Sequence, residues 1–165
     1  MGRLGVYMMV EAGTLEELQE LDDDDLLEEL EALEDETEIY SIDKFWAGLH
    51  FLLTGVSDES PVKDNKLSQA VLGSTPFENI EDFYVALLKK DELPETLKAL
   101  EAVDLKGLEA SFDPGIFAKL KIYPDIWQKT EKVKLFDMLS HEYQGLLEFY
   151  KKAQQKQANV VFSVY

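Results

Sequence analysis

EKVKLFDMLSHEYQGLLEFYKKAQQKQ (residues 131–157), followed by ANVVFSVY (residues 158–165), is the stretch that decides the fold of this chain. Apolar residues recur every three or four positions in the first segment, which places them on one face of a long helix. That face comprises Val133, Phe136, Leu139, Tyr143, Leu146, Leu147 and Tyr150. The residues from 159 to 165 are mostly β-branched or aromatic and predict a strand. A helix that leads into an apolar strand indicates mixed α and β structure.

The N-terminal residues 3–10 have a similar composition and predict a second buried strand. We expect it beside the C-terminal strand, because the ends of a compact domain often lie close together. The sequence between the strands favours helices, the first with a Thr14–Glu17 capping box and the third capped by Ser41 and ended by Gly55. The predicted helices span about 14–21, 24–35, 42–53, 67–72, 79–90 and 94–102, with shorter helical turns at 104–120. The predicted fold is therefore α+β: a single helix-rich domain, residues 1–165, with a small sheet that includes both terminal strands.

Charge is distributed unevenly along the chain. The 165 residues include 34 acidic and 16 basic side chains, a net charge of −18, and the 15 acidic residues between Glu11 and Glu38 have no basic residue among them. Such a field repels nucleic acid and anionic membranes and attracts a basic protein surface. The candidate partner-binding residues are Asp22, Asp23, Asp24, Asp25, Glu28 and Glu29. The alternative interpretation is that these carboxylates form solvated helix faces that only keep the protein soluble.

The sequence lacks the residues and motifs that most common catalytic and metal sites require. The chain has no cysteine, which excludes disulfides, thiolate metal sites and cysteine nucleophiles. Its two histidines, His50 and His141, have no metal-ligand spacing, and the Asp22–Asp25 run has leucines where a calcium loop requires glycine and glutamate. No phosphate-binding glycine loop or nucleophile elbow occurs. We therefore predict no metal site and no cofactor, and assign no catalytic residue.

Two further predictions concern the cellular location of the protein and the role of its basic residues. The start of the chain has no signal-peptide pattern, and the longest apolar run is too short to cross a bilayer, so we expect a cytoplasmic protein without membrane contact. A lysine cluster surrounds two aromatic residues and could stack nucleic acid, but acidic residues interrupt it, which favours a solvated face. The cluster consists of Lys119, Lys121, Lys129, Lys132 and Lys134.

The densest group of chemically useful residues is IDKFWAGLHFLLTG (residues 42–55). On one continuous helix, Asp43, Trp46 and His50 would share a face, because they are three and four residues apart. In a functional interpretation His50 moves protons, Asp43 orients it and Trp46 packs against a ligand. In the structural interpretation, which we favour, Trp46 and His50 belong to the core and Asp43 stabilises the helix start.

The segments LHFLLTG (49–55), AVLG (70–73) and IYP (122–124), in this order, resemble the YfbM-like family, a bacterial family of unknown function. The resemblance covers the whole chain. It implies an α+β domain in the cytoplasm. It implies no established activity, so no catalytic residue is carried over.

Three functional hypotheses follow. The leading one is a non-catalytic interaction protein whose acidic helices steer a basic protein partner, a toxin that it neutralises being one candidate. The second is an enzyme or small-ligand-binding domain with a site around Asp43, Trp46 and His50. The third is an acidic mimic of nucleic acid. A deep pocket lined by Trp46 and His50 would favour the second hypothesis, whereas a buried, hydrogen-bonded His50 beside an exposed acidic surface would favour the first.

Overall fold

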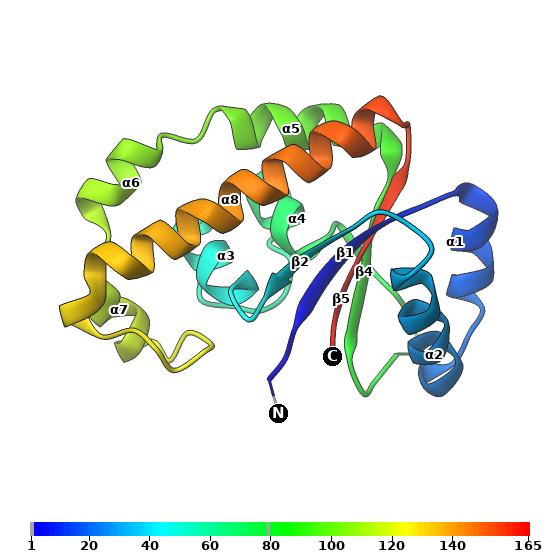
Figure 1. Cartoon of the computed structure of the whole chain (residues 1–165), viewed down its shortest axis with the longest axis horizontal. Helices are drawn as coiled ribbons and strands as arrows, with labels where there is room; N and C mark the ends of the chain where they lie inside the picture. Colours follow the sequence, from blue (N-terminus) through cyan, green and yellow to red (C-terminus); the bar gives the residue numbers. More distant parts are fainter. Residues whose placement is uncertain (1, 79) are drawn as a thin grey trace.

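A five-stranded antiparallel sheet forms the centre of the computed structural model, which describes residues 2–78 and 80–165 (Figure 1). The strand order is β2-β1-β5-β4-β3. The predicted pairing of the terminal strands is confirmed, since Gly5 lies opposite Val164 and Val10 opposite Asn159. The strands are β1 (Gly5–Val10), β2 (Ile39–Asp43), β3 (Thr75–Pro76), β4 (Tyr84–Leu88) and β5 (Asn159–Val164).

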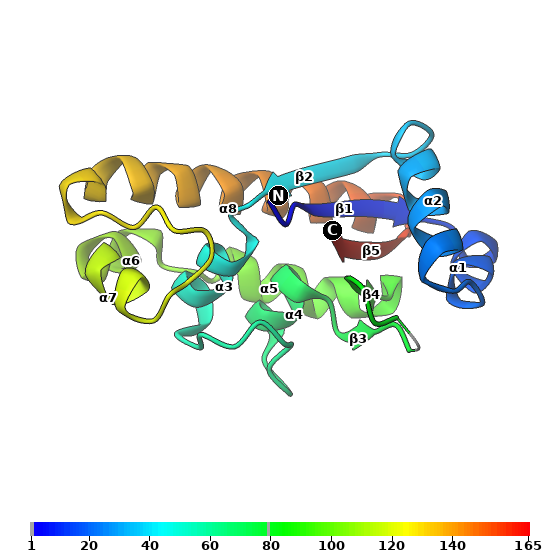
Figure 2. The same cartoon turned by 90° about the horizontal axis from the view of Figure 1, so that it is seen from below.

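Helices cover both faces of the sheet, and the α+β prediction is confirmed (Figure 2). Helices α1 and α2 lie on one face, and α3, α4, α5 and α8 lie on the other. Two 3₁₀ turns, Lys90–Glu92 and Lys129–Glu131, precede α5 and α8. No described helix is long and apolar enough to cross a membrane. The helices are α1 (Ala12–Gln19), α2 (Asp23–Glu34), α3 (Trp46–Thr54), α4 (Lys66–Leu72), α5 (Leu93–Glu101), α6 (Leu105–Ser111), α7 (Pro114–Lys119) and α8 (Lys132–Gln155).

The strands divide their side chains between two cores. Successive residues of a strand point to opposite faces, so Tyr7 and Met9 of β1 pack toward α8, whereas Met8 and Val10 pack toward α1 and α2. The core on the α8 side is the larger and includes aromatic residues of α3, α7 and α8. The core under α1 and α2 consists mainly of leucines and valines.

The carboxyl end of α4 is joined to the sheet and to α8 by three tyrosine hydroxyls. Tyr150, Tyr7 and Tyr84 donate hydrogen bonds of 2.6, 2.5 and 2.6 Å to the carbonyl oxygens of residues 70, 71 and 72 in turn. The last carbonyls of a helix have no partner within the helix, so these bonds satisfy them. Gly73 follows with φ of 82°, and a Cβ there would lie 2.7 Å from the Cβ of Ala86. The AVLG segment is thus a structural junction where only glycine fits its last position.

Two predicted helix starts are wrong. Helix α1 begins at Ala12, directly after β1 and with Glu11 at its N-cap, so Thr14 lies inside the helix and forms no capping box. Ser41 does not cap the next predicted helix, because it lies in β2, and α3 begins only at Trp46. In both places a strand continues up to the helix or close to it and leaves no room for the expected cap.

The helix predicted for residues 79–90 is also wrong where the structure describes it, and residue 79 lies outside the described residues. Residues 84–88 form β4, which pairs with β5 on one side and β3 on the other. Four of its five residues are buried, so its sequence, YVALL, shows no alternation of apolar and polar residues. A short apolar run of this kind cannot be distinguished from a buried helix by periodicity. The helices predicted at 24–35, 67–72, 94–102 and 131–157 agree with α2, α4, α5 and α8.

Candidate functional site

His50 lies in the core and joins three segments of the chain. Its side chain on α3 is only 2% exposed, and its Nε2 lies 2.8 Å from the Oγ of Ser68 on α4. The same Oγ accepts a 2.8 Å hydrogen bond from the backbone N–H of Val62. Burial lowers the pKa of His50, although the backbone carbonyl of Val56 acts in the opposite direction. The predicted burial and hydrogen bonding of His50 are confirmed, and burial favours its neutral form.

Asp43 is not on the helix of Trp46 and His50, so the predicted three-residue face is wrong. Asp43 ends β2 with φ of 57°, is exposed, and accepts a 2.7 Å hydrogen bond from the N–H of Lys44. Aspartate tolerates this left-handed conformation, which allows the chain to turn from the strand into α3. Asp43 and His50 share no hydrogen bond, so the proposed proton-transfer pair does not form in this structure.

Trp46 instead lines a cavity of about 870 Å³ at the end of the sheet where β1 and β4 begin and β5 ends. We call it the sheet-end cavity. Its volume is within the range of small-ligand pockets. His50 does not line it, so the structure separates the two predicted ligand-binding residues. The aromatic residues of its wall are Trp46, Phe83, Tyr84 and Tyr165.

Arg3 occupies one wall of the sheet-end cavity. Its guanidinium carbon lies 5.1 Å from the ring centre of Trp46 and 4.6 Å from that of Tyr123. Two parallel hydrogen bonds of 2.8 and 3.0 Å join the guanidinium to the carboxylate of Glu59, and this contact raises the pKa of Arg3. The backbone N–H of Arg3 donates to the Tyr123 hydroxyl, and its carbonyl accepts from the indole N–H of Trp46. The guanidinium is therefore held by two rings and one carboxylate.

Three carboxylates besides Glu59 also line the cavity. They belong to Glu31 of α2 and to Glu81 and Asp82 of the loop before β4. The Oδ2 of Asp23, at the start of α2, accepts hydrogen bonds of 2.9 and 2.7 Å from the backbone N–H groups of Glu81 and Asp82. This contact fixes the loop against α2 and brings carboxylates from two distant parts of the sequence together.

The predicted partner-binding residues form an acidic surface on α2, defined here as Asp22, Asp23, Asp24, Asp25, Glu28 and Glu29. All are exposed except Asp23, which is half-buried, while Leu26 and Leu30 are fully buried against the sheet. Asp22 caps the helix by accepting a 3.1 Å hydrogen bond from the N–H of Asp25. The acidic surface meets the sheet-end cavity at Glu81 and Asp82. Within residues 2–78 and 80–165, no group of three or more His, Cys, Asp or Glu side chains is placed to hold a metal ion.

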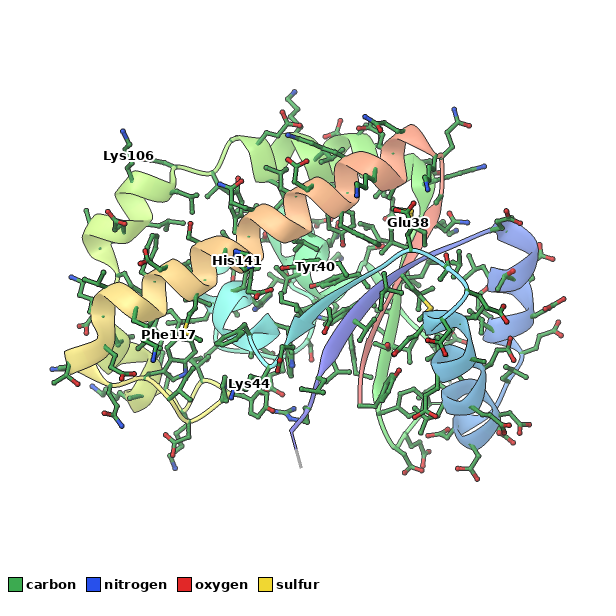
Figure 3. All side chains as sticks on the ribbon, in the orientation of Figure 1. Glu38, Tyr40, Lys44, Lys106, Phe117 and His141 are labelled. Atoms are coloured by element: carbon green, nitrogen blue, oxygen red, sulfur yellow. The ribbon has the colours of Figure 1, made fainter. Side chains whose placement is uncertain are left out.

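A second hollow, about 820 Å³ and shallow, follows the first turns of α8. Val133 is 76% exposed there, and His141 and Glu142 line the same hollow. Figure 3 labels His141 on α8 and Tyr40 on β2, and the Tyr40 hydroxyl donates to the Glu142 carboxylate. Burial raises the pKa of Glu142. The five lysines of the predicted cluster are exposed at this end of the molecule, on α7 and the turn after it, on the 3₁₀ turn before α8, and on α8.

Comparison with known proteins identifies the family. A family model described as "Domain of unknown function (DUF1877)" matches residues 1–163. The chain belongs to this family. The protein YfbM of Escherichia coli K12 is 29% identical over 153 residues, which cover 92% of each chain. A crystal structure titled as a protein of unknown function, YfbM from E. coli, superimposes with a TM-score of 0.83 at 24% identity, over 98% of this chain and 99% of that one. The YfbM-like resemblance is confirmed.

The segments that carry the DUF1877 resemblance have structural roles here. LHFLLTG contains the buried His50 and ends at Gly55, which has φ of 72° and terminates α3. AVLG supplies the carbonyls that the three tyrosines cap. IYP contributes Tyr123, one of the two rings against Arg3. Sequence reasoning missed Arg3, Glu59 and Tyr165, because no local pattern links residues that are tens of positions apart.

Proposed function

We propose that this DUF1877 protein is a non-catalytic interaction protein that binds a basic protein through the acidic surface of α2 and the adjoining loop. The observation that carries the proposal is the arrangement of α2, which buries its leucines and exposes its carboxylates. Glu81 and Asp82 extend this surface because Asp23 fixes their backbone. The leucines of α2 are therefore explained by packing against the sheet, whereas most of its carboxylates have no role within the molecule.

The electrostatics support recognition of a positive surface. No described residue forms an ion pair with the acidic surface, since the three ion pairs among residues 2–78 and 80–165 lie elsewhere. Uncompensated charge of one sign accelerates encounter with a partner of the opposite sign and repels anions. The partner class is therefore a basic protein, for which a basic toxin is one example, and the proposed location is the cytoplasm. The hypothesis of a nucleic-acid mimic has no support other than the charge, so it ranks lower.

The test compares two variants that remove the same number of charges. The first carries Asp24→Asn, Asp25→Asn, Glu28→Gln and Glu29→Gln on the acidic surface. The matched control carries Glu95→Gln, Glu101→Gln, Glu109→Gln and Asp125→Asn, which are exposed and lie on other elements. Asp22 and Asp23 stay unchanged because they hold the helix start and the loop.

Each protein is used as bait in extract of the native host, and captured proteins are identified by mass spectrometry. We expect a basic protein that wild type and control capture and the α2 variant loses. With that protein purified, raising the salt concentration should slow association far more than it accelerates dissociation. Equal capture by both variants, or an association rate independent of salt, would refute the proposal.

A further inference from the structure

We propose that the sheet-end cavity receives an arginine side chain from the basic partner. This inference rests on the proposed function, which it deepens by naming the group that the partner inserts. It does not follow from the charge of α2 alone. It rests on the aromatic wall, on the cavity itself and on the way in which Arg3 is already bound there.

Arg3 shows which group this wall accommodates. Its guanidinium lies against the rings of Trp46 and Tyr123, at 5.1 and 4.6 Å from the ring centres, and pairs in parallel with the carboxylate of Glu59. Ring faces attract cations, and a planar guanidinium matches a carboxylate with two parallel hydrogen bonds. The chain thus contains an internal example of the interaction that we assign to the partner.

Other residues of the lining repeat these components without a cation. Phe83 and Tyr165 meet edge to face at 6.1 Å between ring centres, and Tyr84 lies next to Phe83 in the chain. Glu31, Glu81 and Asp82 line the same space and form no ion pair with any described residue. A second guanidinium would therefore find rings and carboxylates together, as Arg3 does.

The chemistry of the lining selects among ligands. Among the described lining residues, four carboxylates face one guanidinium, which disfavours phosphates, nucleotides and acidic peptides. Arginine is favoured over lysine, because its flat, weakly hydrated group stacks on rings and pairs with two oxygens at once. The cavity also adjoins the acidic surface at Glu81 and Asp82, so a basic segment that crosses α2 can reach it.

The two tryptophans provide an internal control for a binding test. Trp46 lines the cavity, whereas Trp127 is buried elsewhere and donates its indole N–H to the carbonyl of Ile122. The probes are three capped tripeptides, acetyl-Gly-X-Gly-amide, with X as arginine, lysine or citrulline; citrulline has nearly the shape of arginine but no charge. Binding is followed by the indole N–H resonances in nitrogen-15 NMR.

We expect the arginine peptide to shift the Trp46 resonance saturably while that of Trp127 stays in place. The lysine peptide should bind several-fold more weakly and the citrulline peptide at least about tenfold more weakly, since the cation–π and charge contacts are lost. The variant Phe83→Leu, which removes the ring but keeps an apolar side chain, should weaken arginine binding by about threefold to tenfold. Phe51→Leu, at a ring outside the cavity, serves as its control.

The outcomes separate this inference from the proposed function. If citrulline binds as well as arginine, or if Phe83→Leu has no effect, the cavity is not an arginine site, and the acidic surface is unaffected by that result. If the cavity selects arginine but the α2 variant captures every partner that wild type does, the inference stands and the steering role of α2 fails. Equal shifts of both tryptophan resonances would indicate non-specific binding and would overturn the inference.

Discussion

The two faces of the sheet are covered in different ways. On the α8 face, Tyr7 stacks on Phe162 at 4.5 Å between ring centres, and tyrosine hydroxyls connect β1, β4 and α8 to the end of α4. On the other face, α1 and α2 cover Met8, Val10 and Val161 with leucines from both helices and expose almost every acidic side chain. One face is built from aromatic packing and buried hydrogen bonds, and the other from a thin apolar contact beneath a charged exterior.

This difference indicates where stability and recognition lie. Elements with few buried contacts open locally at lower free energy than the core does. The acidic surface and part of the lining of the sheet-end cavity belong to the side covered by α1 and α2, so we expect the surfaces proposed for binding to lie in the part of the fold that opens most easily. Hydrogen exchange and stability measurements can test this comparison.

The largest effect should come from deleting core leucines. Leu139 of α8 and Leu26 of α2 are both fully buried. We expect Leu139→Ala to lower the free energy of unfolding by about 3–5 kcal/mol, because the densely packed α8 face cannot close the cavity. Leu26→Ala should chiefly lower the opening free energy of α1 and α2. Chemical denaturation with native-state hydrogen exchange measures both effects. Equal loss of protection in α1, α2 and α8 for Leu26→Ala would show that the two faces open together.

Two helical glycines give the next largest contrast. A Cβ at Gly48 of α3 would lie 2.6 Å from the Trp127 ring, whereas one at Gly13 of α1 would meet nothing within 4 Å. Gly48→Ala should cost about 1–3 kcal/mol through overpacking, despite the better helix propensity of alanine. Gly13→Ala should stabilise by about 0.5–1 kcal/mol. Thermal melts of both variants measure these changes, and a stabilising Gly48→Ala would disprove the tight contact between α3 and Trp127.

A further prediction concerns pH and the α8 face. Burial lowers the pKa of His50 below its ordinary 6.5, so the unfolded chain takes up a proton more readily than the folded one. The contribution of neutral His50 to the free energy of unfolding is therefore fully present above pH 6.5 and is lost as the pH falls below it. His50→Ala should lose about 1–3 kcal/mol at pH 7.5 through lost packing and the loss of the buried hydrogen bond to Ser68. Acidification should then cost this variant less stability than it costs wild type, because residue 50 can no longer take up a proton.

The control for this experiment is His141→Ala, because His141 is exposed on α8. Denaturation curves at pH 7.5 and 5.5 are compared for the three proteins. Glu142, whose pKa burial raises, is unchanged between wild type and the His50 variant, so the difference between these two proteins isolates His50. A His50 variant that loses as much stability on acidification as wild type would contradict the assignment.

The smallest effect should come from the charges on the thin face. Like charges on α1 and α2 repel one another, and salt screens them over about 10 Å at 0.1 M. Added salt should therefore raise the free energy of unfolding by less than about 1 kcal/mol. Glu28→Gln with Glu29→Gln should reduce this gain, whereas Glu95→Gln with Glu101→Gln on α5 should leave it nearly intact. A salt response that is the same in both double variants would show that repulsion on α2 does not affect folding.

The two faces also differ in what the sequence reveals about them. In α2 and α8 apolar residues recur every three or four positions, so these helices and most of their buried faces could be predicted; Val133, placed on the buried face of α8, is instead 76% exposed. β4 is buried on both faces and β2 is a short edge strand, and neither shows a pattern that excludes a helix. The turn at Asp43 had the largest consequence for the predicted site. Because β2 ends at Asp43, this residue is not on the helix that carries Trp46 and His50.

The candidate site was predictable only in part. The run of aspartates on α2 identifies the acidic surface directly, since its residues are adjacent in the sequence. The sheet-end cavity brings together Arg3, Trp46, Glu59, Phe83 and Tyr165. Pairing of β1 with β5 and of β5 with β4 brings the chain near Arg3, Phe83 and Tyr165 to one end of the sheet, and Arg3 then contacts Trp46 and Glu59. Because that pairing is long-range, local periodicity cannot reveal it.

The pairing of the first and last strands has a practical consequence for attaching labels. Leu4 and Tyr165 exchange backbone hydrogen bonds of 3.0 and 3.3 Å, and Gly2 and Tyr165 both line the cavity. A fluorophore or affinity handle joined to either residue 2 or residue 165 would emerge at the cavity mouth and compete with a ligand. The absence of cysteine offers a better position. Lys106→Cys, on exposed α6 at the far end from α1 and α2, creates one unique thiol for immobilisation (Figure 3).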